Sequence, residues 1–201
     1  MKGIDNNTKN KNELKKELSP SFTNVKLNGG LTPKRPSFFI RTFGCQMNFA
    51  DSFYLSGLLK KKGYEEVHSF EEADVTIFNT CSVREHAERR ALGNIDIAGN
   101  IKKQKPDLKI IVAGCMAENL KEKLFEKKKQ IDGIVGPDHF YELPDILQSL
   151  IKDEKKVIKV GSANGVFSLP CNSIDKKVFS MDIPIMRGCD NFCSYCIVPF
   201  V

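Results

Sequence analysis

Cysteine is the residue type in this chain whose number and spacing point most directly to chemistry. Three of the seven cysteines fall within eight residues, in the pattern Cys189-x3-Cys193-x2-Cys196. Three thiolates this close together can wrap one 4Fe–4S cluster and leave one iron open to a substrate or cofactor. Zinc is the competing interpretation, because Cys193-x-x-Cys196 is also half of a zinc knuckle. No second such pair completes a knuckle, so the spacing favours an iron–sulfur cluster.

A second set of three cysteines is spread along the chain, with separations of 36 and 34 residues: Cys45, Cys81 and Cys115. Each stands just past the end of a predicted strand. Because loops at the carboxyl ends of strands share one edge of an open α/β sheet, we expect these cysteines to lie close together. Gly44 and Gly114 precede two of them, and glycine permits a positive φ or a close approach to a ligand. The set indicates a metal site, either a 4Fe–4S cluster or zinc, against the plainer alternative of buried apolar thiols.

The elements that must position these cysteines follow from the hydrophobic pattern. Apolar and β-branched runs predict strands at 37–43, 75–78, 108–113 and 134–135. Helical patterns are expected over 50–62, from a Ser82-x-x-Glu85 capping box to just before Pro106, and over 117–129 and 138–151. Strands that alternate with helices predict an α/β domain with a mainly parallel sheet over residues 37–160.

The regions outside this domain have different compositions. Residues 1–36 hold eight Lys and Arg against three Asp and Glu, out of a net charge of +6, and have no hydrophobic period. They are predicted to be a disordered basic leader that the fold does not need. Residues 161–177 are interpreted as a linker. Residues 178–201 are expected to form one further strand, at 178–186, and the loop with three cysteines.

Composition also bounds the compartment. The chain begins without the apolar stretch of a secretory signal, and no apolar run is long enough to span a bilayer. We therefore expect a cytoplasmic protein without a membrane segment, and a monomer. Cysteines in such a compartment are more often metal ligands than disulfides. The seventh, Cys171, fits no motif and is interpreted as a spare thiol.

Several stretches together resemble the methylthiotransferase family of radical S-adenosylmethionine enzymes. The resemblance covers about residues 38–201, and its motifs occur in the family's order: TFGCQMN at 42–48, DS at 51–52, NTCSVRE at 79–85, GCMA at 114–117, and PIMRGC at 184–189 followed by CIVP at 196–199. The resemblance implies that the cysteines at 45, 81 and 115 hold an auxiliary 4Fe–4S cluster. Those at 189, 193 and 196 would hold the 4Fe–4S cluster that binds S-adenosylmethionine.

The stretch GCQMN is similar to the branch of the family that acts on tRNA. That resemblance implies methylthiolation of the C2 carbon of the isopentenylated adenosine beside the anticodon. Two molecules of S-adenosylmethionine would be used, and a flavodoxin- or ferredoxin-type protein would supply electrons. The alternatives are a methylthiotransferase that modifies an aspartate of a ribosomal protein, and a metal-binding module without catalytic activity.

The chain departs from the family pattern in three places. Phe53 stands where Glu usually follows Asp-Ser, and Asn119 stands where Gln-Arg is common after Gly-Cys-Met-Ala. The sequence ends at Val201, where the family continues into a TIM-type barrel and a small RNA-binding domain. We therefore expect residues 178–201 to be the first strand and cluster loop of an incomplete radical-SAM barrel, and the chain as it stands to be inactive.

Overall fold

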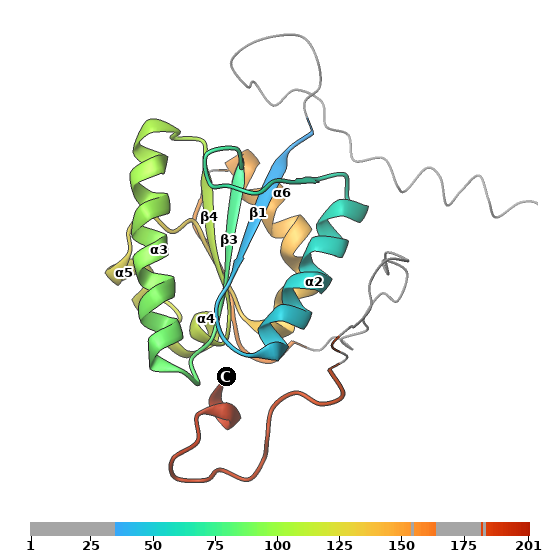
Figure 1. Ribbon diagram of the computed structural model, residues 1–201, viewed down its shortest axis with the longest axis vertical. Coiled ribbons are helices and arrows are strands. Elements are labelled where there is room, and N and C mark those ends of the chain that lie inside the picture. The colour runs from blue at the N-terminus through green and yellow to red at the C-terminus, as the bar shows by residue number, and fades with distance from the viewer. Residues whose placement is uncertain (1–34, 154, 164–181, 183) are drawn as a thin grey trace, which may run out of the picture. The chain divides into compact units, whose positions relative to one another are not determined.

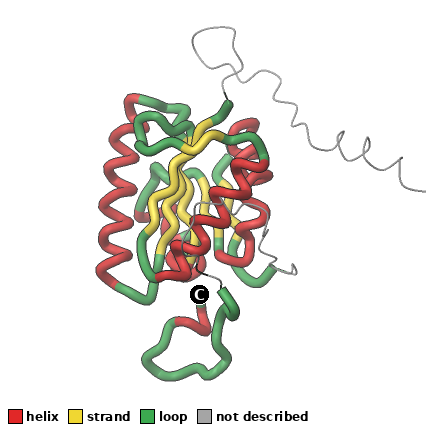
Figure 2. Tube along the Cα trace, turned by 45° about the vertical axis from the view of Figure 1, so that its right-hand side comes forward, coloured by secondary structure: helices red, strands yellow, loops and turns green. Residues whose placement is uncertain are grey.

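The domain that carries the first set of cysteines is a parallel sheet covered by helices on both faces. The computed structural model describes residues 35–153, 155–163, 182 and 184–201. Six parallel strands lie in the order β2-β1-β3-β4-β5-β6, as Figure 1 shows in part and Figure 2 shows as a yellow layer between red helices. The predicted α/β class and the parallel sheet are confirmed. The predicted leader lies outside the described residues, except for its last two positions, and so does Cys171.

The first strand and helix form the start of the sheet. β1 spans Ser37–Thr42, α2 spans Gln46–Lys61, and the short strand β2 spans Glu65–Glu66. The helix begins four residues earlier than the pattern predicted, because Cys45 acts as its N-cap and the Asn48 side chain accepts a hydrogen bond from the Cys45 backbone N–H (3.1 Å). It ends just before Gly63, whose φ of 90° is the conformation that glycine adopts easily.

The centre of the sheet is formed by two buried strands joined by the longest helix. β3 spans Val75–Thr80, α3 spans Glu85–Gln104, and β4 spans Lys109–Gly114. All six residues of β3 are buried, as expected for a strand covered on both faces. The predicted capping box at Ser82 is wrong. The N-cap of α3 is Arg84, and the hydroxyl of Ser82 instead lies 3.5 Å from the amide nitrogen of Asn119.

The remaining elements complete the far side of the sheet. α4 spans Cys115–Leu120 and α5 spans Lys123–Lys127, so the helix predicted over 117–129 is broken, at Lys121, where φ is 48°. β5 spans Gly133–Val135, and a 3₁₀ helix, η1, spans Pro137–Glu142. Then α6 spans Leu143–Asp153 and β6 spans Val157–Lys159. None of the helices in the described ranges is both long and apolar enough to cross a bilayer.

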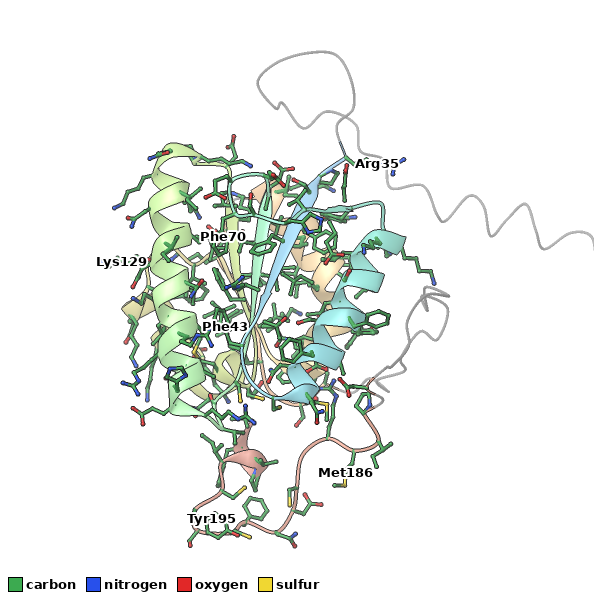
Figure 3. All side chains as sticks on the ribbon, viewed as in Figure 1. Arg35, Phe43, Phe70, Lys129, Met186 and Tyr195 are labelled. Atoms are coloured by element: carbon green, nitrogen blue, oxygen red, sulfur yellow. The ribbon has the colours of Figure 1, made fainter. Side chains whose placement is uncertain are left out.

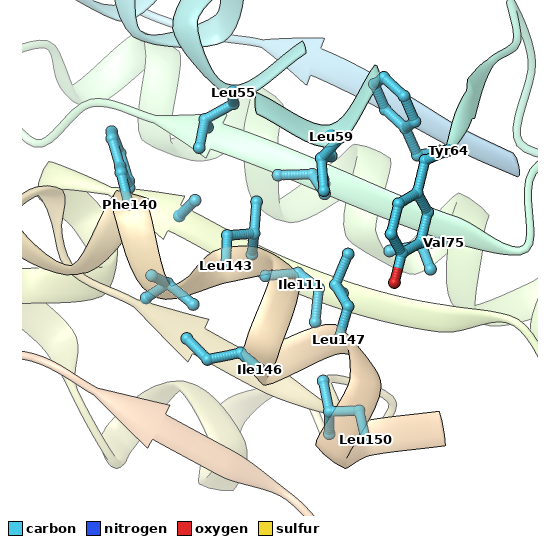
Figure 4. Packing of buried hydrophobic residues seen from close by; sticks show 14 of the residues in the cluster. Leu55, Leu59, Tyr64, Val75, Ile111, Phe140, Leu143, Ile146, Leu147 and Leu150 are labelled. Carbon is cyan, nitrogen blue, oxygen red and sulfur yellow. The ribbon is translucent and has the colours of Figure 1, made fainter. Parts of the chain in front are cut away.

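Two apolar clusters attach the helices to opposite faces of the sheet. On one face, Leu55 and Leu59 of α2 pack with Leu143 and Leu147 of α6 over Ile111 of β4 (Figure 4). On the other face, α3, α4 and α5 cover a cluster that includes Phe43 and Phe78. Phe43 and Phe70, labelled in Figure 3, lie at that second face. Burial of each large apolar side chain contributes about 1.5–3 kcal/mol, so these clusters fix the strands that carry the cysteines.

The C-terminal segment has little regular structure. Its described part, residues 182 and 184–201, contains a single short 3₁₀ helix, η3, at Val198–Phe200. The strand predicted over 178–186 is absent from the positions that are described, 182 and 184–186. The expectation fails there because these residues pair with no strand of the sheet, and a strand without partners has no hydrogen bonds to hold it. Such a segment does not show the start of a barrel.

Candidate metal centre

The first set of cysteines gathers at the carboxyl edge of three neighbouring strands. Cys45 is the N-cap of α2 after β1, Cys81 follows the last residue of β3, and Cys115 follows the last residue of β4. The register pairs Thr80 with Gly114, so Cys81 and Cys115 occupy equivalent positions on strands that lie about 4.8 Å apart. β1 and β3 are likewise paired, up to Thr42 and Asn79. The predicted placement of the three cysteines at the carboxyl edge of one sheet is confirmed.

The strand order explains why this edge is a binding position. The chain runs from β1 to β2 in one direction across the sheet, and from β3 through β6 in the other. The helices after β1 and β3, α2 and α3, therefore cover opposite faces of the sheet (Figure 1). In open α/β sheets ligands bind outside the carboxyl ends of the strands at such a switch point, which in this strand order lies between the first and third strands. Cys45 and Cys81 stand at that point.

The three thiols and one carboxylate at this edge interact electrostatically. Burial, which has the largest effect, and the nearby charges of Cys81, Asp51 and Cys45, in that order, together raise the pKa of the Cys115 thiol to about 11. The backbone N–H of Ser82 donates a hydrogen bond to Cys115 and opposes this rise in pKa. Four acidic groups thus share one partly buried space. A bound cation would favour their charged forms, as metal ions do for coordinating thiols.

Two glycines give the cysteine loops their shape. Gly44 and Gly114 have φ values of 133° and 90°, in the region where other residues are strained. A Cβ atom on Gly44 would lie 2.4 Å from the Cβ of Cys81, and one on Gly114 would lie 2.5 Å from the carbonyl oxygen of Thr80. The expectation that these glycines adopt positive φ is confirmed, and close packing of the loops adds a second requirement for glycine.

A side chain from the C-terminal segment contacts the same region. Arg187, two residues before Cys189, forms an ion pair with Asp51, which is 3% exposed. Arg187 Nη1 lies 3.5 Å from Asp51 Oδ2. Burial raises the pKa of the Asp51 carboxyl, and the hydrogen bond and charge of Arg187 oppose that rise. The sequence offered no reason to pair these two residues, because 136 positions separate them.

The second set of cysteines lies on an exposed loop. Cys193 is exposed, while Cys189 and Cys196 are half-buried. Cys196 N–H donates a backbone hydrogen bond to the Cys193 carbonyl (3.0 Å), and the Asn191 amide lies 3.4 Å from the Cys189 sulfur. Tyr195, labelled in Figure 3, is 90% exposed. The three thiols are therefore close together because they are close in sequence, and not because a sheet brings them together.

The three thiols of the sheet edge are suitable donors for either a zinc ion or an iron–sulfur cluster. Within the described ranges, no three His, Cys, Asp or Glu side chains are arranged to hold one metal ion. A single zinc ion draws each thiolate to about 2.3 Å from the metal, which demands closely converging sulfurs. A 4Fe–4S cubane takes one thiolate at each of separate corners and so accepts sulfurs that lie farther apart. Three thiols, each at the end of its own strand, are donors of the kind that such a cluster takes.

Comparison with known proteins gives this arrangement a class. Residues 37–136, which include all three cysteines of the sheet edge, match the model described as "Uncharacterized protein family UPF0004". The α/β domain described above therefore contains the region that matches this family model.

Its curated relatives are more specific. It is 41% identical over 83% of its length to the tRNA-2-methylthio-N(6)-dimethylallyladenosine synthase of Dictyoglomus thermophilum. The synthase of the same name from Chloroherpeton thalassium is 42% identical over 81%, and that from Clostridioides difficile 40% over 84%. The chain is similar to these synthases over more than four fifths of its own length. It spans 36–38% of their length.

Sequence reasoning missed the polar residues beneath the cysteines. Asn48 and Asn79 are buried, and Thr42, Ser52 and Thr80 hydrogen bond beside them. Each stands inside or next to a motif that contains a cysteine, so its position was visible in the sequence. The available signal was an amide side chain near the carboxyl end of a buried strand, as Asn79 is in β3.

Proposed function

We propose that this chain provides the two iron–sulfur cluster sites of a tRNA methylthiotransferase. The observation that carries the proposal is the gathering of Cys45, Cys81 and Cys115 at one edge of the parallel sheet. They would hold the auxiliary 4Fe–4S cluster through three thiolates. A cluster with three protein thiolates leaves one iron free for an external ligand, which suits a role in sulfur delivery.

The residues around the auxiliary site favour a bound anionic cluster. The N-terminus of the 16-residue helix α2 lies at Cys45, and a helix N-terminus stabilises negative charge. The Ser82 N–H donates to the Cys115 sulfur, and such hydrogen bonds to ligand sulfurs tune a cluster's reduction potential. Gly44 and Gly114 keep the loops free of side chains at the closest approach.

Cys189, Cys193 and Cys196 would hold a second 4Fe–4S cluster that binds S-adenosylmethionine. Such a cluster, once reduced, would supply the electron that splits S-adenosylmethionine into methionine and a 5′-deoxyadenosyl radical. The exposure of Cys193 leaves this loop open to the cofactor and to an external flavodoxin- or ferredoxin-type reductant. The Arg187–Asp51 ion pair supports a working arrangement in which the two cluster sites lie near each other.

The substrate follows from the relatives. Their names state 2-methylthio modification of dimethylallyladenosine in tRNA. The corresponding reaction here is methylthiolation of the C2 carbon of isopentenylated adenosine beside the anticodon, with two molecules of S-adenosylmethionine consumed. Thiolate-ligated clusters and a tRNA substrate both suit the reducing cytoplasm.

Anaerobic reconstitution with iron and sulfide tests the cluster assignment. The wild-type chain is expected to bind about eight iron per chain, as two 4Fe–4S clusters. Replacement by Ser of Cys45, Cys81 and Cys115 together, or of Cys189, Cys193 and Cys196 together, should each remove about four iron. Cys171→Ser is the matched control and should remove none. Zinc alone, or full iron content in either triple variant, contradicts the proposal.

Nucleoside analysis tests the substrate. Total tRNA from a strain that lacks the gene should contain the isopentenylated adenosine without its methylthio group. A strain whose tRNA keeps the methylthio nucleoside while a ribosomal-protein aspartate loses its methylthio group would contradict the tRNA assignment. A strain unchanged in both would indicate a metal-binding module.

A further inference from the structure

Two buried asparagines lie directly beneath the three cysteine loops. Asn48 in the first turn of α2 is 2% exposed, and Asn79 in β3 is 0% exposed. An amide buried in this way is costly unless its donors and acceptors are all used. Their hydrogen bonds therefore show what the pair holds in place.

The two side chains bond each other's residues reciprocally. Asn48 Nδ2 donates to Asn79 Oδ1 (3.2 Å) and to the carbonyl of Thr80 (3.0 Å). Asn79 Nδ2 donates to the carbonyl of Asn48 (2.7 Å) and to Ser52 Oγ (2.9 Å). These bonds join the start of α2 to the end of β3, between which the chain runs through β2 at the edge of the sheet.

Hydrogen bonds of Asn48 reach two of the three cysteine loops. Asn48 Oδ1 accepts the backbone N–H of Cys45 (3.1 Å) and lies 3.4 Å from its thiol. The Thr80 carbonyl that Asn48 binds belongs to the peptide bond leading into Cys81.

The glycines before Cys45 and Cys115 pack closely against the side-chain amides of Asn48 and Asn79. A Cβ on Gly44 would lie 2.2 Å from Asn48 Oδ1, and a Cβ on Gly114 would lie 2.7 Å from Asn79 Oδ1. The two asparagines therefore reach all three cysteine loops, which come from three different strands.

A purely structural role would not require this placement. Leu or Met could fill the same volume between helix and strand, as they do elsewhere in the two clusters. The amide pair instead fixes directions, because Asn48 binds the Cys45 N–H and the Thr80 carbonyl at the bases of two cysteine loops, and Asn79 holds Asn48 in place. Groups that orient metal ligands from behind commonly change metal affinity when they are replaced.

We propose that Asn48 and Asn79 are positioning residues that set the relative placement of Cys45, Cys81 and Cys115 for the auxiliary cluster. The inference rests on the proposed function, since it concerns the geometry of that cluster site. The pair does not touch the cluster itself. It holds the loop bases at one spacing, so that the three thiolates meet three corners of a single cubane.

The test uses the full chain with Cys189, Cys193 and Cys196 replaced by Ser, so that only the auxiliary cluster forms. Asn79→Leu and Asn48→Leu are compared with Thr76→Val, a buried control on the same strand β3. Within the described residues, the Thr76 hydroxyl has no hydrogen-bond partner. The measurements are iron content, the rate of iron removal by a chelator, the EPR spectrum of the reduced cluster, and urea unfolding of the iron-free chain.

Both Asn variants should lose iron to the chelator at least tenfold faster, within the roughly 10- to 100-fold range typical of residues behind metal ligands. Their EPR spectra should change, and Thr76→Val should match the parent in rate and spectrum. Asn79→Asp keeps an oxygen toward Asn48 and serves if the Leu variants do not fold. It should show a smaller increase in the same rate.

The outcomes separate the two proposals. Asn variants that fold, with parent-like chelation rates and spectra, overturn the positioning role and leave the cluster assignment standing. An equal effect of Thr76→Val also overturns it, because the response would then be to any change in β3. A parent chain that binds no iron at the sheet edge overturns both.

Discussion

The two sets of cysteines reach proximity by opposite routes. Cys45, Cys81 and Cys115 are far apart in sequence and meet because three parallel strands end side by side. Cys189, Cys193 and Cys196 are neighbours in sequence and lie on a loop that contains no strand in its described part. The first set is supported by two apolar clusters and a buried amide pair, whereas the second depends on local spacing. Damage to the sheet should therefore affect the first set alone.

The largest expected effect comes from the core beneath the first set. Phe78 of β3 is fully buried and packs against Phe43 and Phe70. Phe78→Ala should lower the free energy of unfolding by about 3–5 kcal/mol, measured by urea titration, because it leaves a cavity at the centre of the sheet. Phe49→Ala, on the exposed side of α2, is the control and should change it little. A loss below about 1 kcal/mol for Phe78→Ala would mean that the sheet does not depend on this cluster.

The next effect is on thiol reactivity in the iron-free chain. Because the folded state raises the pKa of Cys115 from 9.0 to about 11, its thiolate fraction near pH 8 should be about a hundredfold below that of an ordinary thiol. Alkylation of Cys115, followed by peptide mass spectrometry, should keep accelerating up to about pH 11. The folded state also binds this proton more tightly than the unfolded state, so stability should fall as pH rises from 9 to 11.

Alkylation in urea provides the control for that measurement. Unfolding removes the burial and the neighbouring charges, and the acceleration should then level off near pH 9. A Cys115 profile that is the same with and without urea would show that the three thiols do not share one buried space.

A backbone change should have a smaller effect on the same edge. Gly114→Ala places a Cβ at a positive φ and 2.5 Å from the Thr80 carbonyl. It should cost about 2 kcal/mol of unfolding free energy and weaken iron uptake at the sheet edge. Gly93→Ala, in the exposed middle of α3 where a Cβ meets nothing, should instead stabilise the chain by about 0.5–1 kcal/mol. Equal effects of the two substitutions would contradict the packing described for Gly114.

The smallest effect is expected on the exposed loop. Tyr195 is 90% exposed, so Tyr195→Ala should change the unfolding free energy by less than about 0.5 kcal/mol. Iron uptake at Cys45, Cys81 and Cys115 should be unaffected. A clear destabilisation, measured in the same urea titration as Phe78→Ala, would show that the loop is part of the cooperative fold and that the contrast between the two sets is too strong.

The sequence predicted the buried parts of the fold and the position of the cysteines. The strands β1, β3, β4 and β5 were recognisable as apolar runs, and Cys45, Cys81 and Cys115 stood at their ends. It did not predict β2 or β6, because the two glutamates of β2 carry no apolar signal and β6, although apolar at Val157 and Ile158, is only three residues long. Short and charged edge strands of this kind are common, since they discourage pairing with other chains.

The errors at helix starts have a local cause. Cys45 caps α2 although cysteine is not a usual N-cap, and Ser82 does not cap α3 although it has the usual sequence form. The Asn48–Asn79 pair was beyond prediction for another reason. Its geometry requires the order of β1 and β3 in the sheet, which no pattern within either segment contains.

The strand order also sets a sequence of events during synthesis. Cys115 emerges from the ribosome 70 residues after Cys45, about 4–14 s later at roughly 5–20 residues per second. The sheet edge cannot exist before β4 has been made and has paired with β3, and such non-local parallel pairing is slow. The loop at 189–196, by contrast, is complete as soon as it leaves the ribosome. Iron delivered during translation would therefore find the sheet-edge site only after this domain had folded. Folding of the domain thus controls when a cluster can bind at Cys45, Cys81 and Cys115.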